Sequence, residues 1–544
     1  MRPPAPPPGA PPPTAGTDIV LATLNASYIH CAFGLRYLHA NLGELSSRAV
    51  LLEPTINERP VDIVERILAH RPKIVGLGVY VWNARPTRDL VSLLKRVSPD
   101  TWIVLGGPEV SYETSTQEIV DLADFTITGE GDRAFPELCR ALLADTPPTP
   151  TVIRGAADDL TTLQLPYRHY TDHDIRHRVV YVEASRGCPY RCEFCLSALD
   201  TGTRYFPLTN LLKELDALHR RGARIFKFVD RTFNLRMDVA EEILTFFLDR
   251  MAPDLFVHLE VVPDRLPEPL FELLRRFPPG SLQLEIGIQT LNPEVADRIS
   301  RPLKVERVLG NLDRLRRETG AHLHADLIMG LPGETEESFA TGFNRLVQAN
   351  PHEIQVGVLK RLRGTPIIRH ETEFSLAFED IPPYGIMRTS TLSFEQLRRM
   401  GRFAQLWNTV VNSGNFRDTA PLIWRSETPY QGFDRFARWL HGREGKVHGV
   451  SLDRMCRYLL DYLVEERGEP HGPTREGLLT DYERPGRIKI PNFLRDPMVK
   501  RGRSKTSASG TGASSRLARQ RRHGPETATG SGGKSAGKND PPGP

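Results

Sequence analysis

Residues 179–195 read VVYVEASRGCPYRCEFC, and this stretch decides how the rest of the chain is interpreted. It opens with an apolar, strand-like run. Cys188, Cys192 and Cys195 follow within eight residues, at spacings of four and three. A short loop after a strand can direct three such thiolates at one [4Fe–4S] cluster, whereas a structural zinc site needs four protein ligands and no fourth Cys or His follows with finger-like spacing. We therefore predict an iron–sulfur cluster with one open iron.

The strand signal is repeated between residues 179 and 392. Five further strand-like runs follow the first, and amphipathic helical patterns separate them. The six predicted strands span residues 179–184, 225–229, 257–261, 282–288, 322–327 and 353–358. Six β/α repeats are typical of an open relative of the eightfold β/α barrel, in which the chemistry lies at the carboxyl ends of the strands. We therefore predict a partial (β/α)6 barrel over residues 179–392.

An α/β pattern also precedes the cysteines, from residue 18 to residue 144. Five strand signals alternate with helical patterns, which predicts a doubly wound, Rossmann-like parallel sheet. The predicted strands span residues 18–22, 49–53, 74–81, 102–105 and 125–128. Ligands of such sheets bind beyond the carboxyl ends of the strands. At those ends the chain carries Gly106, Gly107, Gly129 and Gly131, where the backbone could approach a ligand that side chains would obstruct.

Four other segments complete the predicted organisation. Residues 1–17 are rich in Pro and lack the apolar core of a secretory signal, so we expect them to be disordered. Residues 145–178 are interpreted as a linker, because they begin with a Pro/Thr-rich stretch. Residues 393–495 show mostly helical patterns with many aromatic side chains, which predicts a helical carboxyl-terminal module. Residues 496–544 are basic and almost free of apolar residues, so we expect a disordered tail.

Composition narrows the class of protein. The formal net charge is only +4, from 71 basic and 67 acidic residues, so nucleic acid is not expected as the main partner. The longest apolar stretch, residues 74–82, is about half as long as a membrane-crossing helix. Six cysteines are too few for a disulfide framework in 544 residues. We therefore expect a cytoplasmic, multidomain protein in which Cys31, Cys139 and Cys456 are ordinary buried thiols.

The spacing Cys-x3-Cys-x2-Cys, with Phe194 before the last cysteine, resembles the radical S-adenosylmethionine (radical SAM) superfamily. This resemblance spans about residues 179–366. It implies that the open iron chelates S-adenosylmethionine, and that reduction cleaves this cofactor to a 5′-deoxyadenosyl radical. By the same resemblance, Phe194 flanks the adenine and Gly330 lies in a turn near it. The contacts to the ribose or the amino-acid part would come from Glu260, Glu285 and Gln289.

One motif departs from the family pattern. The usual Gly-Gly-Glu run after the second strand is missing, and Asp230 and Asn234 stand at the equivalent strand end. Either residue could make the contact to the methionine part of the cofactor. A structural interpretation stays open for the candidate carboxylates, which could be salt-bridge partners, and for Gly330, which could be a turn glycine.

The amino-terminal segment resembles the cobalamin-binding domain that is fused to one branch of this superfamily. The residues that carry this resemblance are Gly106, Gly107, Gly129, Gly131 and residues 23–30. The motif Asp-x-His-x-x-Gly, which supplies a histidine to cobalt in other cobalamin proteins, is absent. The resemblance implies cobalamin as a cofactor, bound without a histidine from that motif. Tyr28 and His30 could approach the cobalt from the first loop, and a sheet that has lost its ligand is the alternative.

Together these resemblances imply a radical SAM enzyme that depends on cobalamin, with C-methylation as the commonest reaction of such fusions. Its partners would be an electron donor such as flavodoxin or ferredoxin and a substrate that the sequence does not name. The layout is similar to a bacterial branch with its own carboxyl-terminal domain. Radical chemistry without cobalamin, such as cyclisation or rearrangement, and a non-catalytic corrinoid or redox sensor stay open. A methylthiotransferase is disfavoured, because the amino-terminal region offers only Cys31 and Cys139 where those enzymes have three further cysteines.

Overall fold

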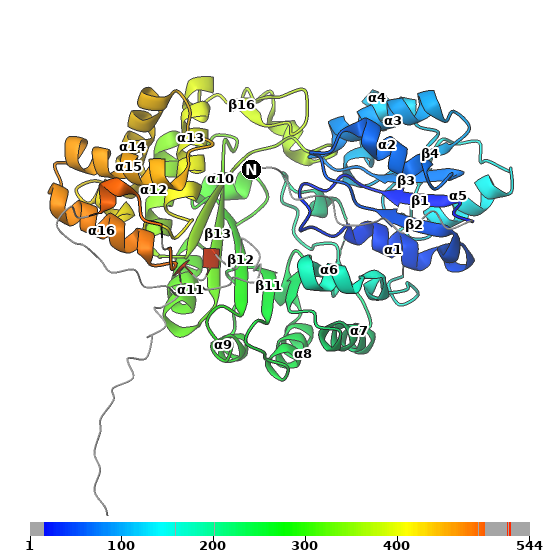
Figure 1. Cartoon of the computed structure of the whole chain (residues 1–544), viewed down its shortest axis with the longest axis horizontal. Coiled ribbons are helices and arrows are strands. Elements are labelled where there is room, and N and C mark those ends of the chain that lie inside the picture. Colours follow the sequence, from blue (N-terminus) through cyan, green and yellow to red (C-terminus); the bar gives the residue numbers. More distant parts are fainter. Residues whose placement is uncertain are drawn as a thin grey trace, which may run out of the picture.

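In the computed structural model, two parallel α/β sheets lie next to each other, and a group of helices packs against the second sheet (Figure 1). The structure describes residues 16–157, 159–200, 202–487, 489–495, 519, 520, 522 and 523. Among the helices in these ranges, none has the length and apolar character needed to cross a membrane. The predicted disorder of residues 1–17 and 496–544 falls almost wholly outside the described residues.

The amino-terminal sheet has six parallel strands in the order β2-β1-β3-β4-β5-β6. Its strands are β1 (Ile19–Ala22), β2 (Ala49–Leu52), β3 (Ile74–Gly78), β4 (Trp102–Gly106), β5 (Phe125–Thr128) and β6 (Val152–Arg154). One face is covered by α2 (Pro60–Leu68), α3 (Ala84–Val97) and α4 (Glu118–Leu122), the other by α1 (Phe33–Asn41) and α5 (Ala134–Leu143). Helices on both faces of a parallel sheet confirm the doubly wound prediction.

The sequence does not predict the sixth strand, because β6 lies in the segment interpreted as a linker. β6 is only three residues long and largely exposed, so no hydrophobic periodicity marks it. It exists because Val152 pairs with Thr126 at the edge of the sheet. The same segment also contains α6 (Asp172–His177), whose first turn is capped by Thr171.

The second sheet has six parallel strands in the order β14-β13-β12-β11-β10-β7, and it confirms the predicted partial barrel. Its strands are β7 (Val180–Val182), β10 (Ile225–Phe228), β11 (Phe256–Val261), β12 (Leu282–Gln289), β13 (His322–Met329) and β14 (Glu353–Val358). The helices between them are α7 (Leu208–Arg220), α8 (Met237–Leu248), α9 (Glu268–Arg275), α10 (Pro293–Arg298), α11 (Val305–Glu318) and α12 (Glu336–Gln348).

The carboxyl-terminal region is helical, as the sequence predicts. It contains α13 (Phe394–Val410), α14 (Pro429–Glu444), α15 (Leu452–Asp461) and α16 (His471–Glu483). Trp407 on α13 packs edge to face against Phe343 on α12, with ring centroids 4.7 Å apart. The buried apolar residues of the barrel and of this region form one continuous cluster. The helices therefore complete the core of the barrel rather than enclosing a separate one.

Two described residues of the basic tail, Arg519 and Gln520, contact the barrel. Arg519 forms an ion pair of 2.8 Å with Glu353, at the start of β14. Gln520 is buried and donates a hydrogen bond to Gln283, at the start of β12. The expectation of a disordered tail does not describe these residues, because buried polar partners on the barrel hold them in place.

A buried network of ion pairs joins the first sheet to the barrel. Arg36 on α1 lies 2.9 Å from Glu53 and 3.0 Å from Asp174 on α6. Arg178, two residues before β7, lies 2.7 Å from Glu53 and 3.0 Å from Asp174. Two guanidinium groups and two carboxylates neutralise one another away from water. This network fixes how the two sheets meet, and the candidate site lies at that junction.

Candidate active site

The three cysteines lie in one loop that a short antiparallel strand pair closes. β8 (Ser185–Arg186) pairs with β9 (Arg204–Tyr205), and the chain between them, residues 187–203, is called the cysteine loop below. Gly187 has a φ of 86°, and a Cβ there would lie 2.2 Å from the carbonyl oxygen of Gly202, so only glycine fits at this closure. The loop follows β7, at the carboxyl end of the first barrel strand, where this kind of fold carries its chemistry.

Glu193, between the second and third cysteines, ties the cysteine loop to the rest of the barrel. Its buried carboxylate accepts hydrogen bonds from His370 at 2.7 Å and Ser300 at 2.8 Å, and forms an ion pair with Arg369. Its backbone N–H donates to the carbonyl oxygen of Ile299. Sequence reasoning missed Glu193, because these side-chain partners lie 107 to 177 residues away along the chain.

A guanidinium group faces the most buried cysteine of the loop. Arg301 Nη1 donates to Cys192 Sγ at 3.6 Å, and its Nη2 donates to the carbonyl oxygen of Gly287. Burial raises the pKa of the Cys192 thiol, and the charge of Arg301 acts in the opposite direction. A positive group beside a cysteine stabilises the thiolate, which is the form that binds iron.

The chemistry of these donors fits a [4Fe–4S] cluster. Each cysteine of a cubane binds a different iron, so three sulfurs on one loop suffice without converging on a single point. Within the described ranges, no group of three or more His, Cys, Asp and Glu side chains could hold one metal ion. The other cysteines stand outside the loop and are buried in hydrophobic cores, at Cys31, Cys139 and Cys456.

A cavity of about 310 Å³ opens at the carboxyl ends of the later barrel strands and brings three predicted cofactor contacts together. Phe194, from the cysteine loop, and Glu285 and Gln289, from β12, all line it. Asp326 on β13 and Lys360 after β14 also add polar groups to its lining. Sequence reasoning did not single out these last two residues. The cavity thus offers an aromatic ring and several polar groups to a ligand beside the cysteine loop.

Glu285 is held in its ionised form. Its Oε2 lies 2.6 Å from Nε2 of His258 and 3.6 Å from Nζ of Lys227. Burial raises the pKa of Glu285, but the hydrogen bond from His258 and the charge of Lys227 outweigh this effect, so the pKa lies below its ordinary value. Gln289 has a φ of 73°, next to a register shift between β12 and β13. An ionised carboxylate in such a cavity can accept hydrogen bonds from ligand hydroxyl groups.

Two other predicted cofactor contacts are bound by protein groups. Glu260 pairs with Arg231 at 3.3 Å. Asp230 is buried and accepts hydrogen bonds from the backbone N–H of Ala184 at 2.9 Å and from the hydroxyl of Ser185 at 2.5 Å. Burial raises the pKa of Asp230 to about 7. Asp230 therefore holds the segment between β7 and β8, which leads into the cysteine loop.

Gly330 and Asn234 also have local packing partners. Gly330 has a φ of 86°, and a Cβ there would lie 2.5 Å from Cγ2 of Ile386. The Asn234 side chain donates to the carbonyl oxygen of Val262 at 3.0 Å and accepts from its N–H at 2.8 Å. These contacts favour the turn-glycine interpretation of Gly330 and a structural role for Asn234.

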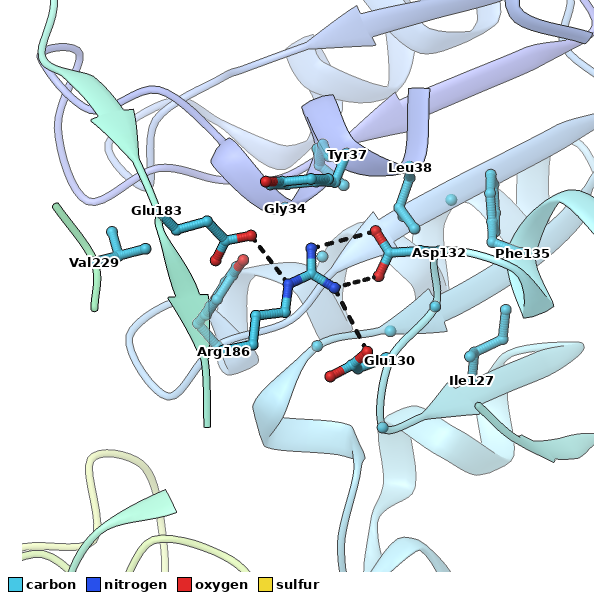
Figure 2. Close-up of a pocket in the computed structure, with 18 of the residues that line it drawn as sticks. Gly34, Tyr37, Leu38, Ile127, Glu130, Asp132, Phe135, Glu183, Arg186 and Val229 are labelled. Carbon is cyan, nitrogen blue, oxygen red and sulfur yellow. Dashed lines mark hydrogen bonds and ion pairs between the residues drawn. The ribbon is translucent and has the colours of Figure 1, made fainter. Parts of the chain in front are cut away.

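A second cavity, of about 370 Å³, lies between the two sheets (Figure 2). Its first wall contains all four glycines that the sequence places at the ligand edge: Gly106, Gly107, Gly129 and Gly131. Gly107 has a φ of 107°, and a Cβ there would lie 2.6 Å from the carbonyl oxygen of Val79. The opposite wall comes from the barrel and the cysteine loop, with Glu183, Arg186, Gly187, Ser197 and Asp200.

The chemistry of this glycine-lined cavity fits a corrinoid, which combines flat rings with amide side chains. The apolar lining includes Leu35, Leu77, Val104, Ile127 and Phe135. Charged groups of the lining include Glu130, Asp132, Glu183 and Arg186 (Figure 2). The described lining contains no histidine. His30 instead lies 2.6 Å from the hydroxyl of Tyr181, and Tyr28 contacts His173. Sequence reasoning missed Arg186 and Glu183, because nothing local distinguishes them from other charged residues.

Family comparisons match three parts of the chain. Residues 182–345 match the Radical SAM superfamily, and residues 19–139 match the B12 binding domain. Residues 372–519 match a family described as a protein of unknown function, DUF4080.

Individual proteins are similar to much of the chain. A 2-(S-pantetheinyl)-carbapenam-3-carboxylate methyltransferase of Streptantibioticus cattleyicolor is 25% identical over 447 residues, which cover 72% of this chain and 65% of that protein. The cobalamin-dependent radical SAM methyltransferase TokK of Streptomyces tokunonensis is 26% identical over 354 residues, 58% of this chain and 50% of that protein. The chain thus spans less than two thirds of both relatives. The solved structure of the cobalamin-dependent S-adenosylmethionine radical enzyme OxsB, with aqua-cobalamin and S-adenosylmethionine bound, aligns with a TM-score of 0.55 at 14% identity, over 86% of this chain and 78% of that one.

The two sheets, the cysteine loop and the family matches define a radical SAM protein with an amino-terminal B12-binding domain. Within that class, this chain carries the DUF4080 domain at its carboxyl-terminal side. The family matches confirm the two domain types that the resemblance implied, and with them the cofactors of those domains: a [4Fe–4S] cluster, S-adenosylmethionine and cobalamin.

Proposed function

We propose that the chain is a cobalamin-dependent radical SAM enzyme that methylates a carbon atom of its substrate. The [4Fe–4S] cluster with S-adenosylmethionine would supply a 5′-deoxyadenosyl radical, and cobalamin the methyl group. The observation that carries the proposal is the glycine-lined cavity, because the B12-binding domain forms one wall and the cysteine loop part of the other. Two relatives named as methyltransferases support methylation as the reaction.

The proposal assigns three kinds of role to the described residues: binding iron, contacting the other two cofactors, and positioning these elements. The iron ligands would be Cys188, Cys192 and Cys195, whose loop Glu193 and Arg301 hold in shape. Phe194, Glu285 and Gln289 would bind S-adenosylmethionine in the cavity of about 310 Å³. Backbone at the four cavity glycines would approach the corrinoid. We assign Asp230, Glu260 and Gly330 to positioning these elements, because each has a protein contact and none of them lines the cavity of about 310 Å³.

An external reductant completes the proposal, since cleavage of S-adenosylmethionine by the cluster consumes one electron. A small redox protein such as flavodoxin or ferredoxin would supply it. Such donors, and cysteines that are few and unpaired, are typical of a reducing compartment, so we propose a cytoplasmic location.

The proposal is tested by anaerobic reconstitution of the full chain with iron, sulfide, hydroxocobalamin and S-adenosylmethionine. We expect about four irons and one cobalt per chain, and 5′-deoxyadenosine after reduction. Cys192→Ala should lose most of the iron and all of the product. The matched control Cys456→Ala, which changes a buried thiol outside the loop, should keep both. Iron and cobalt are measured by elemental analysis, and the nucleoside by chromatography.

The outcomes separate the candidate functions. Product with four irons but no cobalt would support radical chemistry without cobalamin. A cluster that binds S-adenosylmethionine without cleaving it would support a sensor. A chain that retains no cluster under any condition contradicts the proposal.

A further inference from the structure

The cysteine loop is anchored at its base to the B12-binding domain. Arg186 and Arg204 pair with each other across β8 and β9, and both reach the loop that follows β5. Arg186 Nη1 lies 2.8 Å from Oδ2 of Asp132, and Arg204 forms an ion pair with Glu130. These two carboxylates alternate along the chain with glycines that line the cavity between the sheets. The strand pair that closes the cysteine loop is thus bound to one edge of the proposed corrinoid site.

The guanidinium group of Arg186 is enclosed on several sides. Its Nε lies 3.0 Å from Oε1 of Glu183, and its Cζ lies 4.5 Å from the ring centroid of Tyr37 on α1. Figure 2 shows it between Glu183 on one side and Asp132 and Glu130 on the other. Only 14% of the Arg186 side chain and 7% of that of Asp132 are exposed. Ion pairs that are so little exposed are weakly screened by salt. Removing one partner leaves the charge of the other buried and uncompensated.

The same residues contact the cavity and the cysteine loop. Arg186, Asp132 and Glu183 all line the cavity between the sheets. Only Gly187 separates Arg186 from Cys188, and the backbone of Gly187 lies tightly against Gly202. A ligand that displaces the Arg186 guanidinium, or holds it still, therefore acts on the backbone that carries the first cysteine.

We propose that Arg186, together with Arg204, couples the corrinoid cavity to the cysteine loop, so that corrinoid and cluster each change the other's binding. This inference rests on the proposed function, because it takes a corrinoid as the ligand of the cavity. Coupling between two sites is reciprocal: the factor by which the cluster changes corrinoid affinity equals the factor by which the corrinoid changes cluster affinity. Arg186 is in this sense a positioning residue, acting through Asp132 and the base of the loop.

The test compares the full chain with and without its reconstituted cluster. Each form is titrated anaerobically with hydroxocobalamin, and the dissociation constant is read from the visible absorbance of the corrinoid. In the wild type we expect the two constants to differ by at least about fivefold. In Arg186→Gln and in Asp132→Asn we expect the ratio to fall close to 1. Corrinoid should also change the electron paramagnetic resonance spectrum of the reduced cluster in the wild type, and not in these variants.

Control variants separate coupling from general damage. Arg140→Gln removes an arginine from an exposed ion pair with Glu44 on the same domain, and should leave the ratio at its wild-type value. Arg186→Lys keeps the charge but loses the several directed contacts of the guanidinium, and should give an intermediate ratio. If circular dichroism shows that Arg186→Gln is unfolded, Glu130→Gln replaces it in the same titration.

The outcomes for this inference differ from those for the proposed function. A ratio near 1 in the wild type, or an unchanged ratio in the folded variants, overturns the coupling while corrinoid binding stands. Failure of both forms to bind any corrinoid overturns the coupling together with the cobalamin part of the proposed function.

Discussion

At the scale of single residues, Glu334 shows how one buried carboxyl group creates a pH dependence. Oε1 accepts a hydrogen bond from Thr290 at 2.5 Å, and Oε2 has no partner among the described atoms. Burial raises the pKa of Glu334 to about 7, above the value of an unfolded chain. The folded state therefore binds this proton more tightly, and the stability it contributes is present below about pH 4.5 and is lost as the pH rises to about 7, a change of about 3 kcal/mol. Glu334→Gln should thus stabilise the protein more, relative to wild type, at pH 8 than at pH 5.5.

Thermal melting at the two pH values checks this prediction, because the difference between variant and wild type cancels the titration of all other groups. Glu306→Gln, at a carboxylate whose side chain is 84% exposed, is the matched control. An equal difference in melting temperature at pH 5.5 and pH 8 for Glu334→Gln would show that its carboxyl group does not titrate in this range.

At the scale of an element, the cysteine loop depends on Glu193 for its shape. Glu193→Ala removes the acceptor of His370, Ser300 and Arg369 at once, and leaves a buried imidazole without its partner. Groups of this kind, which orient the ligands of a metal site, are worth roughly 10- to 100-fold in metal affinity. We expect the reconstituted cluster to lose iron to a chelator faster by a factor in that range, measured from the decay of its visible absorbance. Ser300→Ala, which removes only one of the bonds, should have a smaller effect; equal rates in Glu193→Ala and wild type would contradict the role of Glu193.

At the scale of the whole molecule, the buried network of Arg36, Glu53, Asp174 and Arg178 holds the two sheets together. Burial raises the pKa of Glu53, but the hydrogen bond and charge of Arg36 outweigh this effect and hold it below its ordinary value. The stability from Glu53 is therefore present above the unfolded pKa and is lost as the pH falls through the lower folded value. Glu53→Gln should cost about 3 to 5 kcal/mol at neutral pH, because it leaves two buried guanidinium groups undercompensated.

Urea unfolding at pH 7 and at pH 4 measures this cost. The difference between Glu53→Gln and wild type should shrink at the lower pH. The comparison variant Glu58→Gln, in an exposed ion pair with Arg66, should lose at most about 1 kcal/mol. A cost for Glu53→Gln as small as that of Glu58→Gln would mean that the network does not hold the sheets together.

Much of the fold could be predicted, because its signals are local. Five of the six strands of the first sheet and all six of the second sheet lie in apolar, strand-like runs, which the sequence shows without knowledge of their neighbours in the sheet. The exception, β6, has no such run and forms only because β5 offers it an edge. For the candidate site, some of the predicted residues line the cavity and others do not. Phe194, Glu285 and Gln289 meet around one cavity, but Asp230 at a neighbouring strand end faces the backbone of Ala184, because the path of the loop decides where a strand-end side chain points.

By itself, the sequence determined the two α/β patterns, the glycines at the edge of the first sheet and the three cysteines on one loop. All of these are properties of residues close together in the chain, so hydrophobic period and spacing reveal them. Tertiary structure alone decided which polar side chains hold the site. Glu193 meets His370 at a separation of 177 residues, Arg178 meets Glu53 at 125 and Arg186 meets Asp132 at 54. Such partners stand on different elements, and only the packing of the two sheets excludes the water that would otherwise solvate each charge separately.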